Sequence, residues 1–544
     1  MGGLRNVVRW AWRWVAVVIV LSSAAYLFAH VSAPEDQVFL GFLANNDDNQ
    51  LYLSYMREGG QGAWLTTIRF TPEEHAPALL LPIYQILGKI ARTLGLSNEL
   101  TFHLARLIGG VMLLATVWWF STLCLPDGLP RQSAFLLACF SSGMGWILVI
   151  TRLADTVIMP VDIRVPESST FLTIFTSPHF VLGVTFELLT FIFFLGAGKR
   201  RWYLLGAGIS LLLLSVTLVY NVIVVAVALA GTVLIRCWRR KRVWIPDLWR
   251  AIAIGALSAP VIVYYYLILR FDPFWSIAYG EHDVVRSPPL LALLLGYGLV
   301  FWLAVWGMAL WVRRRQWTPP RILLAVWVVS NGTLLYAPLA FQGKLAAGWH
   351  VGLCLTAAVG LHDGLLPWLR GQRWFGNLAT HSYRLSTTTR NVVLILTIPS
   401  TLLVALIGFR VAAAEHYFPY YLPVQDVRAV AWLEAHAGAH DVVLSSYAIG
   451  NYVVAHTDAR SFLGHQFAVI DPQGKDRAMR RFFSGTSTED VQRALVRDHG
   501  ITFVFCGTHE RALGSLDLGS MDWLVPVYVK GPIAVYRVRE TEDR

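Results

Sequence analysis

The sequence predicts a polytopic α-helical membrane protein of about eleven transmembrane helices, followed by a small C-terminal α/β domain. Three observations support this fold class. Of the 544 residues, 56% are hydrophobic and only 15% are charged, and the mean hydropathy is +0.52. The apolar runs reach the length of about 20 residues that a helix needs to cross a bilayer. The basic residues gather in short clusters between these runs, as in the cytoplasmic loops of membrane proteins.

The basic clusters set the orientation of the chain. They lie at residues 5–13, 199–201, 239–242, 313–315 and 370–390. Because Lys and Arg are enriched in cytoplasmic loops, we place all these clusters and the N-terminus in the cytoplasm. The net charge of +11 is therefore explained by topology and does not indicate a nucleic-acid partner.

The apolar stretches between the clusters are the predicted spans. They lie at residues 14–30, 103–123, 132–150, 178–198, 202–217, 220–237, 251–269, 290–312, 321–340, 350–369 and 391–411. The first is longer than the apolar region of a signal peptide, so we expect a retained anchor. A further apolar stretch, residues 78–96, is short and is interrupted by Lys89 and Arg92. If it crossed the bilayer, the later basic clusters would lie on the opposite side of the membrane from residues 5–13. We therefore predict an amphipathic helix in the membrane interface. Pro77 helps to start this helix.

This topology places four loops and the C-terminal part, residues 413–544, on the extracytoplasmic side of the membrane. The loops are residues 31–77, 151–177, 270–289 and 341–349.

The chain changes character near residue 413, where apolar runs shorten and charge rises to the level of soluble proteins. Residues 425–436 have helical periodicity, residues 441–446 and 501–507 are typical of buried strands, and residues 525–530 with 533–538 are typical of a hairpin. We therefore divide the chain into a transmembrane catalytic domain, 1–412, and an extracytoplasmic α/β domain, 413–544. No nucleotide-binding motif indicates the use of ATP.

The outer loops carry the side chains that are candidates for chemistry. The first contains Asp47 and Asp48 in LANNDDNQLY, then Glu74 and His75. Acidic pairs in polar segments are also typical of solvated turns, whose Asn and Asp side chains bond to their own backbone. Glu74 and His75 also suit the capping of the following helix.

The later loops add a second set of candidates. Glu167 and His179 lie in or beside the second outer loop, and Gln342, Lys344 and His350 lie in FQGKLAAGWH. Carboxylates in an early loop with basic and amide groups in a late one suit two tasks, which are taking a proton from a nucleophile and holding a phosphate leaving group. The basic side chains also suit simple contact with lipid headgroups.

Taken together, these motifs resemble those of the GT-C glycosyltransferases, membrane enzymes that use polyprenyl-phosphate-linked sugars. The resemblance rests on the acidic first loop, on His75-Ala76-Pro77 before the expected interfacial helix, and on Arg106 in LARLIGG. It extends to FQGKLAAGWH and to GNYVVAHTDARSFLGHQ at 450–466. The chain departs from the family where Ala76 replaces a proline and where Gly343 replaces an expected basic residue. It also lacks the W-W-D-Y-G signature of oligosaccharyltransferases.

The resemblance implies transfer of a hexose or pentose from a polyprenyl-phosphate donor to a hydroxyl of a glycan, lipid or protein acceptor on the extracytoplasmic side, with inversion. We expect an aspartate as the general base, and Asp48 rather than Asp47. The donor and its phosphate are assigned to Lys344, His350, Gln342, Arg106 and His179, and substrate orientation to Glu74, His75 and Glu167. Asp47 and Asp48 are the candidates for Mg²⁺ or Mn²⁺, although no ligand spacing requires a cation.

Two other functions fit parts of the sequence. Glu187 lies alone in the middle of a predicted span, where a charge is costly, and a transporter or flippase of a lipid-linked or small polar substrate needs such a group. However, we find no second carboxylate at the midplane and no two-half symmetry, and we expect Glu187 to pair with a neighbouring helix near Tyr220 and Asn221. A non-catalytic assembly factor is the third possibility, and it predicts that Asp47 and Asp48 are dispensable.

Overall fold

The structure is a computed structural model that describes residues 2–154, 156–281, 284–372, 382–514 and 516–539. The chain forms two compact units. The first comprises Met1–Ala24, His103–Tyr266 and Val284–Ile407, and the second comprises Ala25–Phe102, Leu267–Asp283 and Gly408–Arg544. The domain boundary predicted at residue 412 rests on the change in sequence character, and it stays a prediction.

A helix occurs at each of the predicted spans. The main apolar helices are α1 (Gly2–Val31), α4 (Asn98–Cys124), α5 (Leu129–Phe140), α9 (Pro178–Gly196), α10 (Arg201–Thr217), α11 (Asn221–Arg240), α12 (Ile245–Phe271), α14 (Leu290–Arg314), α15 (Pro319–Leu334), α16 (Trp349–Val359), α18 (Ser382–Thr397) and α19 (Pro399–Ala414). Among the described residues, eight helical stretches are long and apolar enough to cross a membrane. A ninth is added if α18 and α19, which are bent by 43°, form one span. The predicted eleven thus include short helices such as α10.

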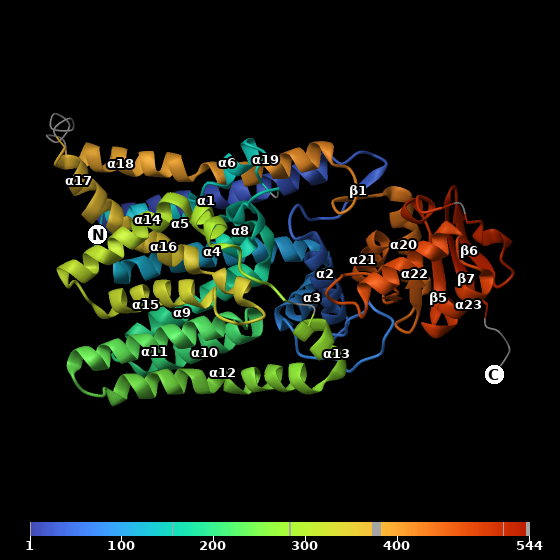
Figure 1. Ribbon diagram of the computed structural model, residues 1–544, viewed down its shortest axis with the longest axis horizontal. Helices are drawn as coiled ribbons and strands as arrows, with labels where there is room; N and C mark the ends of the chain where they lie inside the picture. The colour runs from blue at the N-terminus through green and yellow to red at the C-terminus, as the bar shows by residue number, and fades with distance from the viewer. Residues whose placement is uncertain (1, 155, 282–283, 373–381, 515, 540–544) are drawn as a thin grey trace. The chain divides into compact units, whose positions relative to one another are not determined.

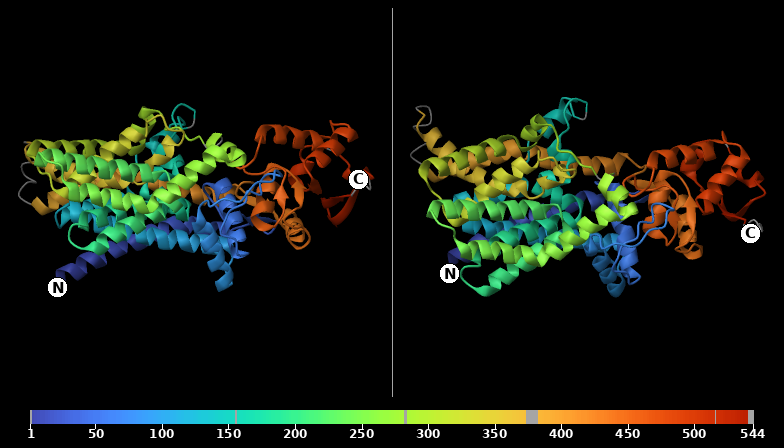
Figure 2. Two further views of the ribbon diagram at one scale, coloured as in Figure 1. Left: turned by 90° about the horizontal axis from the view of Figure 1, so that it is seen from below. Right: turned by 60° about the horizontal axis from the view of Figure 1, so that its bottom comes forward.

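The helices of the first unit lie side by side in a bundle, which Figures 1 and 2 show from three directions. Helices α14 and α16 pack without intervening side chains. A Cβ atom on Gly307 of α14 would lie only 2.2 Å from the carbonyl oxygen of Thr356 in α16. Only glycine allows this approach, which brings the two backbones into van der Waals contact.

The second unit begins with two helices from the first loop region, α2 (Asn46–Gly60) and α3 (Pro82–Leu94). Helix α3 lies inside the predicted stretch 78–96, but it starts at Pro82, so the expectation that Pro77 begins it is wrong. Its exposed face carries Ile86, Ile90 and Leu94, which follow one another at helical spacing. An exposed apolar stripe on an amphipathic helix is what an interfacial location requires.

A five-stranded sheet forms the centre of the C-terminal part. Its order is β4-β3-β5-β7-β6, in which β3 pairs in parallel with β4 and β5, and β7 pairs antiparallel with β5 and β6. The strands are β3 (Val442–Leu444), β4 (Arg460–Ser461), β5 (Ile501–Cys506), β6 (Leu524–Lys530) and β7 (Ile533–Val538). The predicted strands and hairpin are confirmed, as is the helix predicted at 425–436, which is α20 (Val424–His436).

Three further helices surround this sheet, namely α21 (Tyr447–His456), α22 (Pro472–Ser484) and α23 (Glu489–Asp498). A separate pair of strands joins the first loop to the tail, because β1 (Gln37–Phe39) pairs antiparallel with β2 (Tyr421–Pro423). The second unit is therefore built from both ends of the chain.

Candidate functional site

The two adjacent aspartates lie in the first turn of α2. The segment predicted as a loop, residues 31–77, therefore contains a helix at this point. In a helix, neighbouring side chains are about 100° apart around the axis, so Asp47 and Asp48 still diverge. Carboxylates near a helix N-terminus are stabilised by the partial positive charge there.

Asp48 is paired with a histidine from the C-terminal part. Its Oδ1 atom lies 2.8 Å from Nε2 of His465. The His465 side chain is 3% exposed, whereas that of Asp48 is 36% exposed. Within the described part of the chain, Nδ1 of His465 has no hydrogen-bond partner. A carboxylate can only accept, so Nε2 carries the proton that is donated to Asp48.

Asp47 has a different partner. Its Oδ2 atom accepts a hydrogen bond of 2.8 Å from the hydroxyl of Tyr447, the first residue of α21. The two carboxylates are thus held by separate donors, one a buried imidazole and one a phenol. The two aspartates, which are the same residue type, therefore differ in their hydrogen-bond donors.

The sequence analysis assigned no role to His465, although this residue lies in the quoted motif GNYVVAHTDARSFLGHQ. Only GHQ, residues 464–466, lies outside regular elements; GNY belongs to α21. A Cβ atom on Gly450 would lie 1.9 Å from the carbonyl oxygen of Leu463. The glycine therefore lets α21 approach the segment that carries His465, and both glycine motifs serve to position this histidine.

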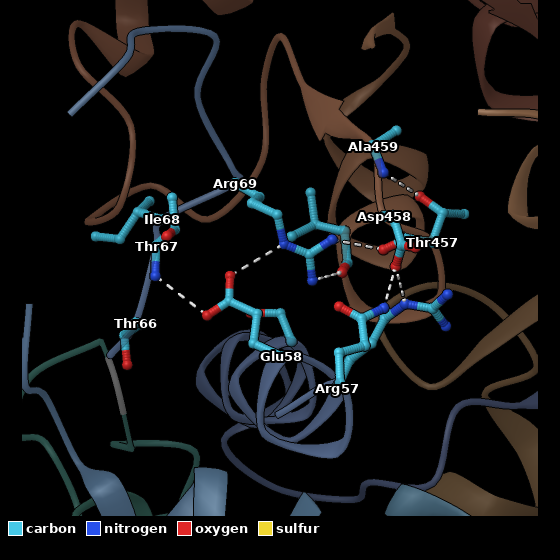
Figure 3. Close-up of polar contacts among 12 residues, drawn as sticks. Arg57, Glu58, Thr66, Thr67, Ile68, Arg69, Thr457, Asp458 and Ala459 are labelled. Carbon is cyan, nitrogen blue, oxygen red and sulfur yellow. Dashed lines mark hydrogen bonds and ion pairs between the residues drawn. The ribbon is translucent and has the colours of Figure 1, made fainter. Parts of the chain in front are cut away.

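A buried ion pair lies near the other end of α2 (Figure 3). Glu58 accepts a hydrogen bond of 3.2 Å from Nε of Arg69, and both side chains are less than a tenth exposed. The guanidinium of Arg69 also donates to the carbonyl oxygens of Thr457, at 2.6 Å, and Val454, at 3.2 Å. One arginine thus joins the first loop region to the end of α21.

A second arginine adds to the same junction. Arg57 contacts Asp458 at 2.7 Å and donates to the carbonyl oxygen of His456 at 2.9 Å. Since Asp47 meets Tyr447 where both helices begin, α2 and α21 run in the same direction and are tied at both ends. The position of Asp48 is therefore set by the C-terminal part of the chain.

The residues that follow α2 in the sequence have structural partners. Ring atom Nδ1 of His75 lies 3.0 Å from the carbonyl oxygen of Glu73, and Nε2 accepts from the amide of Ile68 at 3.0 Å. The ring stacks on Phe274 with a centroid distance of 3.7 Å. Both nitrogens of His75 thus hold the loop backbone, and burial lowers its pKa. Glu74 is exposed.

The FQGKLAAGWH candidates lie in the first unit. Gln342 and Lys344 belong to the short helix η3 (Gln342–Ala346). Lys344 lies with Nζ 3.3 Å from the hydroxyl of Tyr220 and 4.6 Å from the centre of its ring. The lysine charge is therefore held against an aromatic face, which still permits interaction with an anion.

His350 and Glu167 are brought together in the same unit. Both line a cavity of about 10 Å³ with Ser169, Thr170 and Gly348, which is room for about one water molecule. His350 is 2% exposed, and its Nδ1 lies 3.0 Å from the hydroxyl of Thr170.

The two remaining donor candidates are buried among helices of the first unit. Arg106 is 1% exposed and donates to the carbonyl oxygens of Ser22 and Ile174, at 3.2 and 2.9 Å. His179 lies in the first turn of α9 and is 4% exposed. Their roles in donor binding stay predictions.

Glu187 pairs with a neighbouring helix, as predicted. It is fully buried, and its Oε2 atom accepts a hydrogen bond of 2.8 Å from Nδ2 of Asn221 in α11. The same amide donates to the carbonyl oxygen of Ala347 at 3.0 Å. The carboxyl group thus connects α9 to two other segments of the first unit.

The aspartate pair does not form a ready-made cation site. Across the residues that the structure describes, no group of three or more His, Cys, Asp or Glu side chains is arranged to hold a metal ion. Asp48 is engaged by the N–H group of His465, a donor that would compete with a cation. The binding of Mg²⁺ or Mn²⁺ by the two aspartates stays a prediction.

Comparison with known proteins identifies the fold. No family model matches the sequence, and no curated protein matches it significantly. Among solved structures, the apo oligosaccharyltransferase of Archaeoglobus fulgidus has a TM-score of 0.57 at 12% identity, covering 94% of this chain and 72% of that one. Apo ArnT from Cupriavidus metallidurans has a TM-score of 0.52 at 11% identity, covering 98% of both chains.

A second ArnT structure of that organism, bound to undecaprenyl phosphate, has a TM-score of 0.50 at 11% identity, covering 96% of this chain and 97% of that one. These neighbours are membrane glycosyltransferases of the GT-C kind. The similarity covers the helical bundle and the C-terminal sheet region alike, and the sequence motifs had pointed to the same group. The chain has the GT-C membrane fold, with a small β-sheet region at its C-terminal end.

Proposed function

We propose that the protein is a membrane glycosyltransferase that transfers a sugar from a polyprenyl-phosphate donor to an acceptor hydroxyl on the extracytoplasmic side, with Asp48 as the general base. The observation that carries the proposal is the pairing of Asp48 with the buried His465. A solvated turn does not require a buried histidine as the partner of its carboxylate.

In the proposed reaction, the acceptor oxygen attacks the anomeric carbon of the donor sugar. The new carbon–oxygen bond forms as the bond between that carbon and the phosphate oxygen breaks, and polyprenyl phosphate leaves with the electron pair. Asp48 takes the hydroxyl proton. A carboxylate with an ordinary pKa of about 3.9 is a weak base for a free alcohol, but the hydroxyl becomes acidic as its bond to carbon forms.

His465 acts as a positioning residue in this proposal. Its N–H group fixes one oxygen of Asp48 and stabilises the ionised carboxylate, since hydrogen bonds to a charged acceptor are the strong ones. Asp47, held by Tyr447, has a supporting role. No step passes through a metal ion.

The leaving phosphate develops negative charge, which a cation in a partly dry site stabilises well. We assign this task to Lys344, because Tyr220 holds its ammonium group in place. His350 and Glu167, which share one small cavity, are assigned to the donor and to substrate orientation. Gln342, Arg106 and His179 complete the proposed donor set.

The test is a transfer assay with the purified full-length chain in detergent. It is incubated with a panel of radiolabelled polyprenyl-phosphate hexoses and pentoses and with candidate glycan, lipid and protein acceptors. Wild type is expected to consume at least one donor, and the Asp47→Asn/Asp48→Asn double variant is expected to bind that donor without turnover. Full turnover by the double variant would refute the assignment of the base and favour another class of function.

Replacing His465 by asparagine is expected to lower kcat by about 10- to 100-fold, because a hydrogen bond to a charged group contributes about 1.5–3 kcal/mol. The donor KM should stay within about threefold of wild type, since the histidine does not contact the donor in our proposal. Steady-state kinetics measure both constants. His436→Asn, at an exposed position of α20, is the matched control and should leave both unchanged.

Replacing Lys344 by alanine is expected to raise the donor KM by about tenfold, which corresponds to about 1.4 kcal/mol of lost binding. Steady-state kinetics at varied donor concentration measure this KM, and donor titration by filter binding shows whether the change lies in binding. Lys199→Ala removes an exposed lysine of a basic cluster and serves as the control. An unchanged KM in the Lys344 variant would assign the lysine to packing against Tyr220 alone.

A further inference from the structure

A cavity of about 400 Å³ opens in the C-terminal part of the second unit. Its size falls within the range of small-molecule sites, about 300–1,000 Å³. The lining residues are Phe483, Cys506, Glu510, Arg511, Gly514, Leu516, Asp517, Leu518 and Tyr536. Neither the proposed reaction nor the aspartate pair uses any of them.

The cavity lies where binding sites form in sheets of this type. Cys506 is the last residue of β5, and β5 stands between the parallel strand β3 and the antiparallel strand β7. Ligands of open α/β sheets bind beyond the carboxyl ends of parallel strands. Cys506 marks that end of β5, so the cavity lies beside one such strand end.

The floor of the cavity is apolar and aromatic. Phe483 and Leu518 are each 2% exposed, and Tyr536 is 8% exposed. Burial raises the pKa of the Cys506 thiol to about 11, so this group is uncharged at neutral pH. The floor thus offers flat, apolar surface of the kind that packs against the C–H face of a sugar ring.

The mouth of the cavity is polar and carries both signs of charge. Arg511 and Asp517 are exposed there. Arg511 donates through Nε to the carbonyl oxygen of Pro532, which orients its guanidinium group. Asp517 accepts from the amide of Gly519 at 3.0 Å through Oδ1. The cavity is lined by Arg511, Asp517 and the buried Glu510. Two carboxyl groups disfavour a phosphate or a polyanion, and the exposed pair of opposite charges suits a ligand without net charge.

We propose that this cavity binds a neutral sugar residue of the acceptor glycan. The phenol of Tyr536, the thiol of Cys506, the guanidinium of Arg511 and the carboxylate of Asp517 all line the cavity, so four polar groups are available to one ligand. The adjacent hydroxyl groups of a sugar ring can bond to all four of these groups. A zwitterionic amino acid would need only one cation and one anion. The assignment to an acceptor rests on the proposed function; the binding of a sugar does not.

Binding is tested on the full-length chain in detergent by saturation-transfer NMR and titration. The probes are neutral trisaccharides of glucose, mannose and arabinose, a galacturonic acid trisaccharide, and phenylalanine. At least one neutral trisaccharide is expected to bind with a Kd below about 10 mM. It should also slow the alkylation of Cys506 by iodoacetamide, followed at about pH 9.5, where a small fraction of this thiol is ionised, and measured by mass spectrometry at that residue.

Two variants test whether the sugar binds in this cavity, and one control variant changes a residue outside it. Leu516→Trp, which fills the cavity from its rim, and Arg511→Ala should each weaken binding at least about tenfold. Arg497→Ala removes an exposed arginine of α23 that does not line the cavity and should bind like wild type. The alkylation of Cys506 is measured on the wild-type protein, so a variant that fails to fold does not affect this result.

Asp48→Asn separates this proposal from the proposed function, because it should lose turnover and keep sugar binding. Failure of all neutral trisaccharides to bind would overturn the sugar site while leaving the reaction intact. Binding that persists in both cavity variants, or selective binding of phenylalanine or the galacturonic acid trisaccharide, would overturn it as well.

Discussion

Replacing Asp48 by asparagine is expected to lower kcat by about 10²- to 10⁴-fold, the range that a general base contributes. The amide cannot accept the acceptor proton, yet it has nearly the same size and still accepts the hydrogen bond from His465. Donor binding should therefore be retained. Single-turnover kinetics with a radiolabelled donor measure the chemical step apart from product release.

Asp47→Asn is the matched control because it makes the same chemical change one residue away. It should lower kcat by no more than about tenfold, the effect of weakening one hydrogen bond, here that from Tyr447. If the larger loss occurred in the Asp47 variant, the roles of the two aspartates would be exchanged. Equal and small losses in both would exclude either as the base.

Replacing Arg69 by methionine is expected to destabilise the second unit by about 3–5 kcal/mol at pH 8, as the breaking of buried ion pairs does. The variant leaves the Glu58 carboxylate buried beside an apolar side chain and removes the donors to two carbonyl oxygens. Chemical denaturation in detergent, followed by the fluorescence of tryptophans, measures the loss.

The comparison is Arg493→Met, which removes an arginine that is 41% exposed and paired with Glu489 and Asp522. Exposed ion pairs contribute about 0–1 kcal/mol, so this variant should remain close to wild type. Similar losses of unfolding free energy in the two variants would show that burial does not determine how much the Arg69 ion pair contributes to stability.

The same pair should make stability depend on pH. Burial raises the pKa of Glu58 from 4.5 to about 7, although Arg69 opposes the rise. As pH rises through this window, the unfolded chain loses the proton first, so the unfolded state binds fewer protons than the folded state. The contribution of Glu58 to stability should therefore fall between about pH 4.5 and 7. Glu58→Gln is expected to remove this part of the slope in unfolding curves recorded across the window.

The membrane helices were predictable because each depends on a local property, the length of an apolar run. The same holds for β5 and the β6–β7 hairpin, whose apolar periodicity identifies them. Helix α2 was not predictable in this way, since NNDDNQ is rich in turn-forming residues. Tertiary packing stabilises it instead, for example through Tyr52, which stacks on Tyr84 of α3 at 4.3 Å.

The candidate site was predictable only in part. Asp47 and Asp48 were candidates because they form a carboxylate pair, but the neighbouring sequence does not indicate which residues they contact. A local signal for α21 existed in Ser446, whose side chain caps the helix by accepting from the amide of Ile449. His465 gave no such signal, because its role arises from contact with Asp48 and not from a pattern along the chain.

The hydrogen bond between Asp48 and His465 joins residues that are 417 positions apart. At a synthesis rate of about 5–20 residues per second, the chain between them takes roughly 20–80 s to make. For most of that interval β2 and α21 have not yet been made, and Asp48 lacks its histidine until the end. The segment translated among the first is thus among the last to reach its final structure. A message cut short between codons 415 and 464 would encode every described membrane helix but not the histidine that holds Asp48.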